Sequence, residues 1–362
     1  MYPLIAIAKA LSEKAKILGA NLELIILGDG IFVERAAKEN DIPFKKIYSG
    51  KFRRYFSHES IFDVLKIPLS FIQSFFYLFW FMPDIVFTKG GYTSFAPAIA
   101  AKLFFIPVFI HESDSVPGLA NKIIGKMATA VFLSFKTTEK YFNSAKVVFT
   151  GNPVRKNLAQ GDKNSAREYF NLYEPKPTIL ILGGSQGAKI INEVIVSSLV
   201  VLAEKFNIIH QCGESQLESV KKDVDTILQE GTQQYSALLK TYYRYYSFLD
   251  ENQYILAFSI ADIVISRAGS GALFEIAQAG KPAIIIPISQ SPGDHQYLNA
   301  LEFGLFGGQL LEESNLNRES LIHRIENILK PENYDLITEK IKTFAKPDAA
   351  DKIAESLLSM GS

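Results

Sequence analysis

The segment from Asp262 to Ile288 reads as an apolar strand, a short glycine loop, a helix and a second apolar strand. A similar segment runs from Asp84 to Ile110, with an aspartate, a basic residue and a glycine in the same order and a proline after the helix. Strands that alternate with helices in this way form parallel sheets covered by helices. The sequence therefore predicts two similar α/β halves that face a cleft lined by glycine loops.

Length and charge agree with this division. The chain has 362 residues, more than a single core usually supports, so two domains are expected. Its 38 basic and 38 acidic residues give a net charge of zero, and we expect no nucleic-acid partner. The single cysteine, Cys212, excludes an internal disulfide, and no Cys/His cluster indicates a metal. We expect neither a cofactor nor a bound metal.

The glycine loops have the pattern of an anion site. Gly269 and Gly271 would let the backbone approach a ligand, and a helix expected to begin near Ala272 would direct its free N–H groups at an anion. The sequence GGSQG at residues 183–187 follows another apolar run, and Ser185 could offer its hydroxyl to a phosphate. One such turn is often purely structural, but two together favour a phosphate-binding site.

Other polar residues join these loops. Glu275 is expected in the first turn of its helix, where a carboxylate is stabilised and can accept hydrogen bonds from both hydroxyls of a ribose. That combination suggests a nucleotide, although an ordinary acid near a helix start would look the same. His111 and Glu112 end an apolar strand at the edge where open α/β sheets bind ligands. A histidine there is more often packed than catalytic.

The run from Phe71 to Phe81 is the most apolar part of the chain. It is too short to cross a bilayer, which needs about 20 helical residues. Basic residues precede it, namely Lys45, Lys46, Lys51, Arg53 and Arg54. An apolar helix with a basic rim predicts contact with an anionic membrane surface. The alternative is a helix that only covers the sheet, and exposure of Phe79 and Trp80 distinguishes the two.

Several segments occur in an order that resembles the MurG family of peptidoglycan glycosyltransferases over nearly the whole chain. They are GGYTSFAPA, HESDSVPGLANK, GNPVR, LGGSQGAK and RAGSGALFEIAQAGKPAIIIP followed by GDHQYLNA. The resemblance implies a GT-B fold of two Rossmann-like, doubly wound parallel-sheet domains. Residues 1–154 would bind lipid I and the membrane, residues 155–335 would bind UDP-N-acetylglucosamine, and residues 336–362 would form a C-terminal helix packed on the first domain.

The resemblance also implies an activity and a location. An inverting hexosyltransferase would move N-acetylglucosamine from UDP-N-acetylglucosamine to lipid I, making lipid II for peptidoglycan, and would thereby serve cell-wall growth, cell shape and cell division. It would act without a metal, as a peripheral protein on the cytoplasmic face of the inner membrane. Preorganised N–H groups, with Arg155 or Arg267, would stabilise the departing diphosphate. A soluble UDP-N-acetylglucosamine epimerase-like enzyme and a noncatalytic membrane-associated nucleotide-sugar binder are the alternatives.

Family roles carry over to matching positions of this sequence. The donor-binding residues would be Asp114, Arg155, Ser185, Leu249, Arg267, Gly269, Ser270, Gly271, Ala272, Leu273, Phe274, Glu275 and Gln296. The acceptor side would comprise Gly90, Gly91 and Tyr92, with His111 and Glu112 as the candidate general bases.

The sequence departs from the family pattern in two places. Asp114 stands where the family usually has an asparagine, and an ionised aspartate accepts hydrogen bonds but donates none. The family also has a strand and a GGTGGH loop before the positions matched by Tyr2 and Pro3. We expect that strand and loop to be encoded upstream of Met1, since the histidine of the loop is the family's favoured base or acceptor-binding group and transfer can fail in a chain that lacks it.

Overall fold

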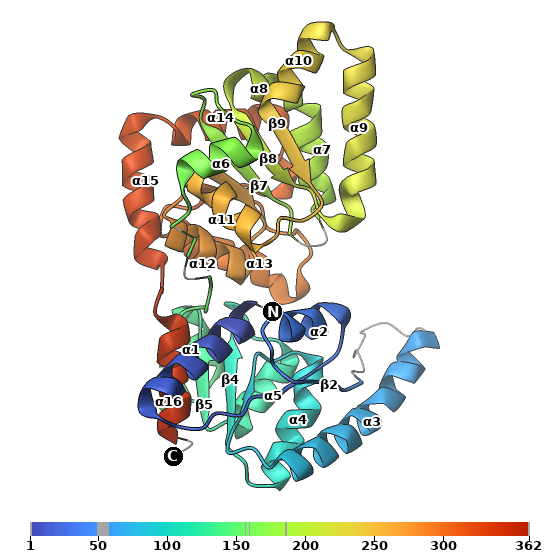
Figure 1. The fold of residues 1–362 in the computed structure, drawn as a ribbon, viewed down its shortest axis with the longest axis vertical. Helices are drawn as coiled ribbons and strands as arrows, with labels where there is room; N and C mark the ends of the chain where they lie inside the picture. The colour runs from blue at the N-terminus through green and yellow to red at the C-terminus, as the bar shows by residue number, and fades with distance from the viewer. Residues whose placement is uncertain (1, 49–57, 156, 159, 185–186, 361–362) are drawn as a thin grey trace. The chain divides into compact units, whose positions relative to one another are not determined.

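The computed structural model describes residues 2–48, 58–155, 157–158, 160–184 and 187–360. The chain divides into two compact units (Figure 1). The first unit comprises Met1–Val154 and Lys346–Ser362, and the second comprises Arg155–Ala345. The chain therefore returns to the first unit at residue 346, and the helix before that point stays with the second unit.

The first unit contains two parallel sheets. Its four-stranded sheet has the order β3 (Val86–Thr88), β4 (Val108–Glu112), β5 (Ala130–Leu133) and β6 (Val147–Phe149). A separate pair is formed by β1 (Ile26–Gly28) and β2 (Phe44–Lys46). The central strands β4 and β5 are buried along their whole length, as expected of apolar strands covered on both faces.

Strands β1 and β3 share their packing without pairing. Leu27 and Val86 contact one apolar cluster, and Leu24 and Phe87 contact the other. In the described part of the chain β1 bonds only to β2, and β3 bonds only to β4.

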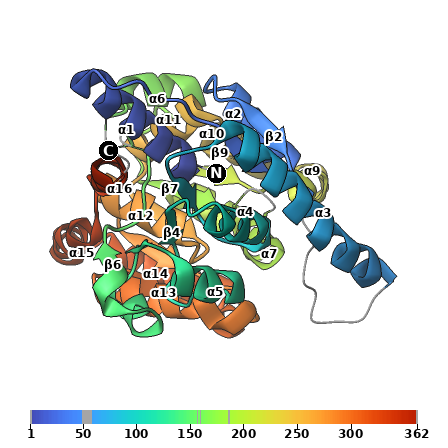
Figure 2. The same ribbon diagram turned by 90° about the horizontal axis from the view of Figure 1, so that it is seen from below.

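Helices cover both faces of the four-stranded sheet. α1 (Tyr2–Leu18) and α16 (Ala349–Met360) lie side by side (Figure 2). Their residues Leu11 and Ile353 pack with Phe109 and Phe132 of the sheet. The opposite face is covered by α3 (His58–Phe81), α4 (Tyr92–Leu103) and α5 (Leu119–Met127), while α2 (Ile31–Lys38) contacts the β1–β2 pair. The C-terminal helix is thus part of the first unit.

The second unit has one six-stranded parallel sheet in the order β12-β11-β10-β7-β8-β9. Its strands are β7 (Thr178–Leu182), β8 (Asn207–Gln211), β9 (Tyr243–Tyr246), β10 (Ile263–Ser266), β11 (Ala283–Ile285) and β12 (Gln309–Leu310). Its helices are α6 (Lys163–Phe170), α7 (Lys189–Ser197), α8 (Leu199–Lys205), α9 (Leu217–Glu230), α10 (Gln233–Tyr242), α11 (Glu251–Ile260), α12 (Ser270–Ala279), α13 (His295–Gly304), α14 (Arg318–Ile328) and α15 (Pro331–Phe344). The predicted doubly wound, parallel-sheet architecture is confirmed.

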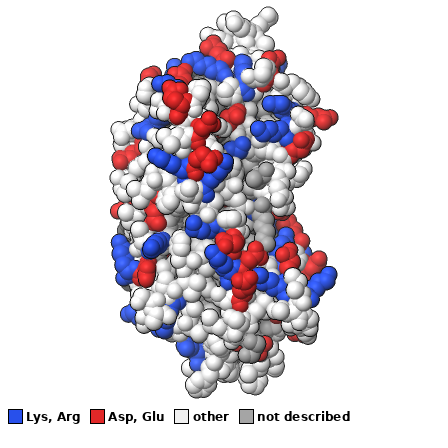
Figure 3. All heavy atoms as spheres, turned by 90° about the vertical axis from the view of Figure 1, so that its left-hand side faces the viewer, with Lys and Arg blue, Asp and Glu red and all other residues white. Residues whose placement is uncertain are grey.

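The surface carries charges of both signs. On the face drawn in Figure 3, basic and acidic side chains are interspersed, in keeping with the zero net charge. Among the described residues, no helix combines the length and the apolar character needed to cross a bilayer.

Candidate functional site

Two loops predicted to bind phosphate meet at the carboxyl edge of the sheet in the second unit. Strands β7 and β10 are neighbours, and Leu182 pairs with Ser266 at their ends. The loop that begins at Gly183 follows β7, and the loop of Arg267 to Gly269 follows β10. The strand order changes direction between these strands, and open α/β sheets bind ligands at such a point. Ser185 lies outside the described residues.

Glycines in the two loops serve different purposes. Gly187 has a φ of +81°, and a Cβ there would lie 2.3 Å from the carbonyl oxygen of Cys212, so a side chain cannot fit. A Cβ on Gly269 or Gly271 would meet no atom within 4 Å. The space beside this second loop is therefore open to a ligand.

Helix α12 begins earlier than the sequence suggested. It starts at Ser270 with Gly269 as its N-cap, so the expectation of a start near Ala272 was wrong. No side chain of the described residues caps this end, which leaves its first N–H groups available to an anion. The earlier start also moves Glu275 out of the first turn, contrary to our expectation. The helix start consequently does not explain how that carboxylate is held.

Glu275 is instead held by two side chains from other segments. Its Oε2 accepts a hydrogen bond of 2.9 Å from the hydroxyl of Tyr254, and its Oε1 is paired with the guanidinium of Arg155. The residue is only 6% exposed. Burial raises the pKa of Glu275, while the charge of Arg155 and the hydrogen bond from Tyr254 act in the opposite direction.

Arg155 is locked from several sides. Its guanidinium carbon lies 4.4 Å from the centroid of the Tyr254 ring, and its carbonyl oxygen accepts a 2.6 Å bond from Nε2 of Gln278. The structure thus brings Arg155 and Glu275, predicted separately, into one buried cluster. Sequence reasoning missed Tyr254, which lies among apolar residues of α11 and belongs to no motif.

Arg267 has partners within its own unit. Its guanidinium forms a 2.6 Å ion pair with Glu313 and donates to the carbonyl oxygens of Ile286 at 3.1 Å and Pro287 at 3.3 Å. These contacts tie the loop after β10 to the loop after β11. The geometry supports a structural role for Arg267 more directly than a contact with a diphosphate.

Two further donor candidates are placed by backbone hydrogen bonds. Leu249 has a buried side chain, and its N–H donates to Oε1 of Gln211 at 3.2 Å. Gln296 accepts a 3.2 Å bond from the N–H of Ile288 through its Oε1. Leu249 is thus held by its backbone beside Gln211, with its side chain in the core.

In the first unit, His111 is fully buried beside Lys89. The ammonium of Lys89 donates to Nδ1 of His111 at 2.9 Å and to Oδ1 of Asn152 at 3.4 Å. An ammonium cannot accept a hydrogen bond, so Nδ1 of His111 must be the acceptor. The ring proton is therefore on Nε2, which donates to the carbonyl oxygen of Gly151 at 3.0 Å. Burial lowers the pKa of His111 well below its ordinary value. With both ring nitrogens engaged, His111 suits a structural role better than that of a general base.

Glu112 has the properties of an acid–base group. Burial raises its pKa to about 7. Its Oε1 accepts from the N–H of Asp114 at 2.9 Å, and its Oε2 accepts from Nδ2 of Asn121 at 2.6 Å. A carboxyl group that titrates near neutral pH can exchange protons with a substrate at that pH.

Asn121 connects Glu112 to the predicted acceptor loop. Its Oδ1 accepts from the N–H of Gly91 at 3.0 Å. A Cβ on Gly90, whose φ is +80°, would lie 1.8 Å from the same oxygen, so glycine is required there. Tyr92 begins α4 and is exposed. Sequence reasoning gave no role to Asn121, although it lies within a segment that carried the resemblance.

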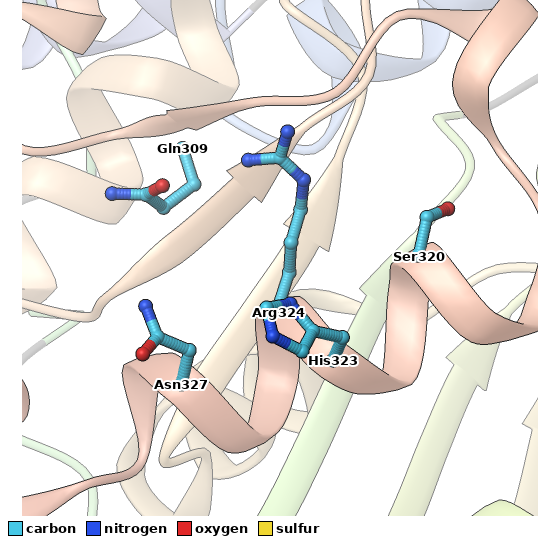
Figure 4. Close-up of a pocket in the computed structure, with 5 residues that line it drawn as sticks. All are labelled: Gln309, Ser320, His323, Arg324 and Asn327. Carbon is cyan, nitrogen blue, oxygen red and sulfur yellow. The ribbon is translucent and has the colours of Figure 1, made fainter.

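A hollow of about 360 Å³ lies away from these residues. It is lined by Gln309, Ser320, His323, Arg324 and Asn327 (Figure 4). It lies along α14 and the edge strand β12, and it contains no residue predicted to bind a substrate. The candidate site consequently rests on the loops and buried clusters described above.

Comparison with known proteins adds a family. The family model of the glycosyltransferase family 28 N-terminal domain matches residues 1–133. The model of the glycosyltransferase family 28 C-terminal domain matches residues 178–353. Together these matches cover most of the chain, including both glycine loops of the second unit.

Curated relatives are more than one third identical to the chain over the aligned residues. The UDP-N-acetylglucosamine–N-acetylmuramyl-(pentapeptide) pyrophosphoryl-undecaprenol N-acetylglucosamine transferase of Clostridium perfringens is 37% identical over 324 residues, covering 89% of this chain and 85% of that protein. The protein of the same name from Legionella pneumophila is 37% identical over 339 residues, covering 92% of this chain and 88% of that protein.

Solved structures share the fold. The crystal structure of Acinetobacter baumannii MurG has a TM-score of 0.71 at 25% identity, covering 98% of this chain and 96% of that one. A putative UDP-N-acetylglucosamine 2-epimerase from Listeria monocytogenes has a TM-score of 0.68 at 15% identity, covering 99% and 94% of the two chains. The second likeness shows the fold alone.

Proposed function

The chain belongs to the MurG transferases of glycosyltransferase family 28, and on that premise we propose that it transfers N-acetylglucosamine from UDP-N-acetylglucosamine to lipid I, making lipid II for peptidoglycan. The relatives' names describe this transfer. The observation that carries the proposal is the second unit's uncapped α12 start beside the buried carboxylate of Glu275. Together they offer one group for a diphosphate and one for a ribose.

The second unit binds the donor. The first N–H groups of α12 hold the diphosphate, because a helix start favours negative charge and the open side of Gly269 lets phosphate oxygens approach. Glu275 accepts hydrogen bonds from the ribose hydroxyls. When the bond to the anomeric carbon breaks, negative charge grows on the diphosphate, and N–H groups already in place stabilise it without reorganisation.

The first unit binds the acceptor and activates it. A hydroxyl of the muramyl sugar displaces UDP at the anomeric carbon with inversion, and a base must take its proton. Glu112 is the better candidate base, since His111 has both ring nitrogens engaged. The exposed Tyr92, which begins α4 next to Gly91, contacts the acceptor.

The first unit also contacts the membrane. Trp80 is 75% exposed and Phe79 is 53% exposed, which favours the membrane-contact interpretation of α3 over a helix that only covers the sheet. At the end of the adjoining helix α4, Phe105 is 93% exposed. Rings of Phe79 and Phe104 join the two helix ends, with centroids 6.2 Å apart. A lipid surface would cover these apolar side chains.

Two residues of this apolar surface have an unusual backbone. Met82 and Phe105 have φ values of 44° and 59°, a region that normally favours glycine at helix ends. Such conformations cost about 1 to 2 kcal/mol and are often kept for a function. They direct large apolar side chains outward where a turn would ordinarily expose a glycine.

Exposed basic residues precede a contact with the middle of α3. Lys45 and Lys46 are exposed on β2, and the backbone N–H of Tyr48 just after them donates to Oε1 of Gln73 on α3 at 2.9 Å. Lys51, Arg53 and Arg54 lie outside the described residues. An exposed basic strand beside an apolar helix is the combination that anionic headgroups bind, which supports a peripheral position on the cytoplasmic membrane face.

The proposal is tested by assaying transfer of labelled N-acetylglucosamine from UDP-N-acetylglucosamine to a lipid I analogue. Glu275→Ala should raise the Kd for UDP by at least about tenfold, whereas an exposed-site control, Leu336→Ala, should leave it unchanged. Release of N-acetylmannosamine or its nucleotide without an acceptor would favour the epimerase alternative. Unchanged UDP affinity in Glu275→Ala would refute the ribose assignment.

A further inference from the structure

Tyr254 contacts both charged residues of the buried cluster in the second unit. Its hydroxyl donates to Oε2 of Glu275 at 2.9 Å, and its ring lies 4.4 Å from the guanidinium carbon of Arg155. The ring also packs on Phe258, with centroids 5.0 Å apart. One buried side chain therefore sets the position of an anion and a cation at once.

The helix that carries Tyr254 is fixed at its start. Asp250 caps α11 by accepting from the N–H of Gln253 at 2.8 Å, and Gln253 returns a contact by accepting from the N–H of Asp250 at 2.9 Å. This capping box comes directly after the donor candidate Leu249. Tyr254 consequently stands in the first turns of a capped helix that directly follows a residue expected to touch the donor.

Hydrogen-bond capacity shows that Tyr254 and a ribose can use Glu275 together. A carboxylate offers about four acceptor positions on its two oxygens. Arg155 uses one on Oε1 and Tyr254 uses one on Oε2, which leaves a position on each oxygen. Two neighbouring ribose hydroxyls need two acceptors. The contacts to both oxygens fix the plane of the Glu275 carboxylate. They therefore also fix the directions of its two remaining acceptor positions.

Burial makes this support necessary. It raises the pKa of Glu275, and the charge of Arg155 and the Tyr254 hydroxyl oppose that rise. Loss of the hydroxyl would leave one carboxylate oxygen without a fixed donor in a buried position, and it would favour the protonated acid. A protonated or rotated carboxyl group would match a ribose less well.

We propose that Tyr254 is a positioning residue for the donor nucleotide, fixing the carboxylate of Glu275 so that it recognises the ribose hydroxyls. This inference rests on the proposed function, because it takes the donor to be a uridine diphosphate sugar. Tyr254 need not touch the nucleotide. It confers preference for ribose over deoxyribose through Glu275.

The test uses Tyr254→Phe, which keeps the ring against Arg155 and removes only the hydroxyl. Isothermal titration calorimetry of the full chain measures binding of UDP and of 2′-deoxy-UDP. UDP should bind about tenfold more weakly to the variant, the effect of losing one hydrogen bond to a charged group, while the Kd for 2′-deoxy-UDP should change less than about threefold. Tyr173→Phe, at an exposed tyrosine of the same unit, is the control and should change neither Kd.

Kinetics separate positioning from a general structural effect. The KM for the donor should rise about tenfold in Tyr254→Phe while kcat stays within about twofold, and the melting temperature should match that of Tyr173→Phe within a few degrees. Equal weakening of UDP and 2′-deoxy-UDP, or no weakening of either, would overturn the inference and leave the proposed function in place. Failure of the unaltered chain to bind UDP would overturn the proposed function itself.

Discussion

His210 should make the second unit less stable as the pH falls. It is fully buried on β8, where its Nε2 donates to Oδ1 of Asn192 at 3.0 Å and its Nδ1 accepts from the hydroxyl of Tyr243 at 2.9 Å. Nδ2 of Asn192 donates to the carbonyl of Cys212 at 3.0 Å, which fixes the orientation of the amide. A second proton on the ring would have no acceptor, and burial lowers the pKa of His210 to about 3.

The size of the effect follows from the two protonation states. An unfolded histidine has a pKa of about 6.5. Below that pH the unfolded chain therefore binds a proton at His210 that the folded unit does not bind. The contribution of neutral His210 is therefore complete above about pH 6.5 and is lost as the pH falls towards 3. Between about pH 7 and pH 5 the loss covers roughly 1.5 pH units, or about 2 kcal/mol of the free energy of unfolding.

The assay compares the unaltered chain with His210→Gln, which retains an amide but cannot titrate. Urea unfolding is followed by reaction of Cys212 with a dipyridyl disulfide, because this buried residue is the chain's single cysteine and reports on the second unit alone. Other groups also make stability depend on pH, and Glu112, with its raised pKa, acts in the opposite direction. Both proteins contain these groups, so their effects cancel in the comparison.

The free-energy difference between the two proteins should shrink by about 2 kcal/mol from about pH 7 to pH 5. A difference that stays constant within about 0.5 kcal/mol would refute the neutral, buried state of His210.

Three further outcomes follow from the first unit and the glycine loops. The kcat/KM of transfer should rise with pH through about 7, and Glu112→Gln should lower it by about 10²-fold or more; a flat profile in the unaltered enzyme would exclude Glu112 as the base. Trp80→Glu should reduce flotation with anionic vesicles relative to Leu336→Glu, and equal flotation would remove α3 from the membrane contact. Gly187→Ala should lower the free energy of unfolding by at least about 2 kcal/mol; the matched change Gly269→Ala, at an open position with negative φ, should cost less than about 1 kcal/mol, and equal costs would contradict the close contact with Cys212.

The sequence predicted the architecture because its signals are local. Apolar runs such as Thr178–Leu182 and Ile263–Ser266 need burial on two faces, and the helices between them force parallel pairing. The glycine loops followed from the same pattern. The start of α12 was harder to place, because a glycine at position 271 is typical of a loop yet here lies inside the first helical turn.

Side-chain contacts could be predicted only at positions that accept a single residue type. Gly90 and Gly187 were marked by their motifs, and the structure shows close contacts that exclude a Cβ at both positions. Lys89 is the basic residue that the segment from Asp84 to Ile110 shares with the later one, but its approach to His111 depends on two strands meeting in register. No local pattern reveals that a histidine predicted as a candidate base has both ring nitrogens already bonded.

The donor cluster shows why separate assignments of residues are incomplete. Arg155 and Glu275 were each assigned to the donor, yet the structure makes them one buried ion pair. The partner that links them, Tyr254, lies on a third segment and reads in sequence as another apolar core position. Groups that share hydrogen bonds in a buried site act together, so the affinity of any one for a ligand depends on the others. Under the proposed function, recognition of the ribose would therefore be a property of all three side chains, and it would arise only when the fold brings their segments together.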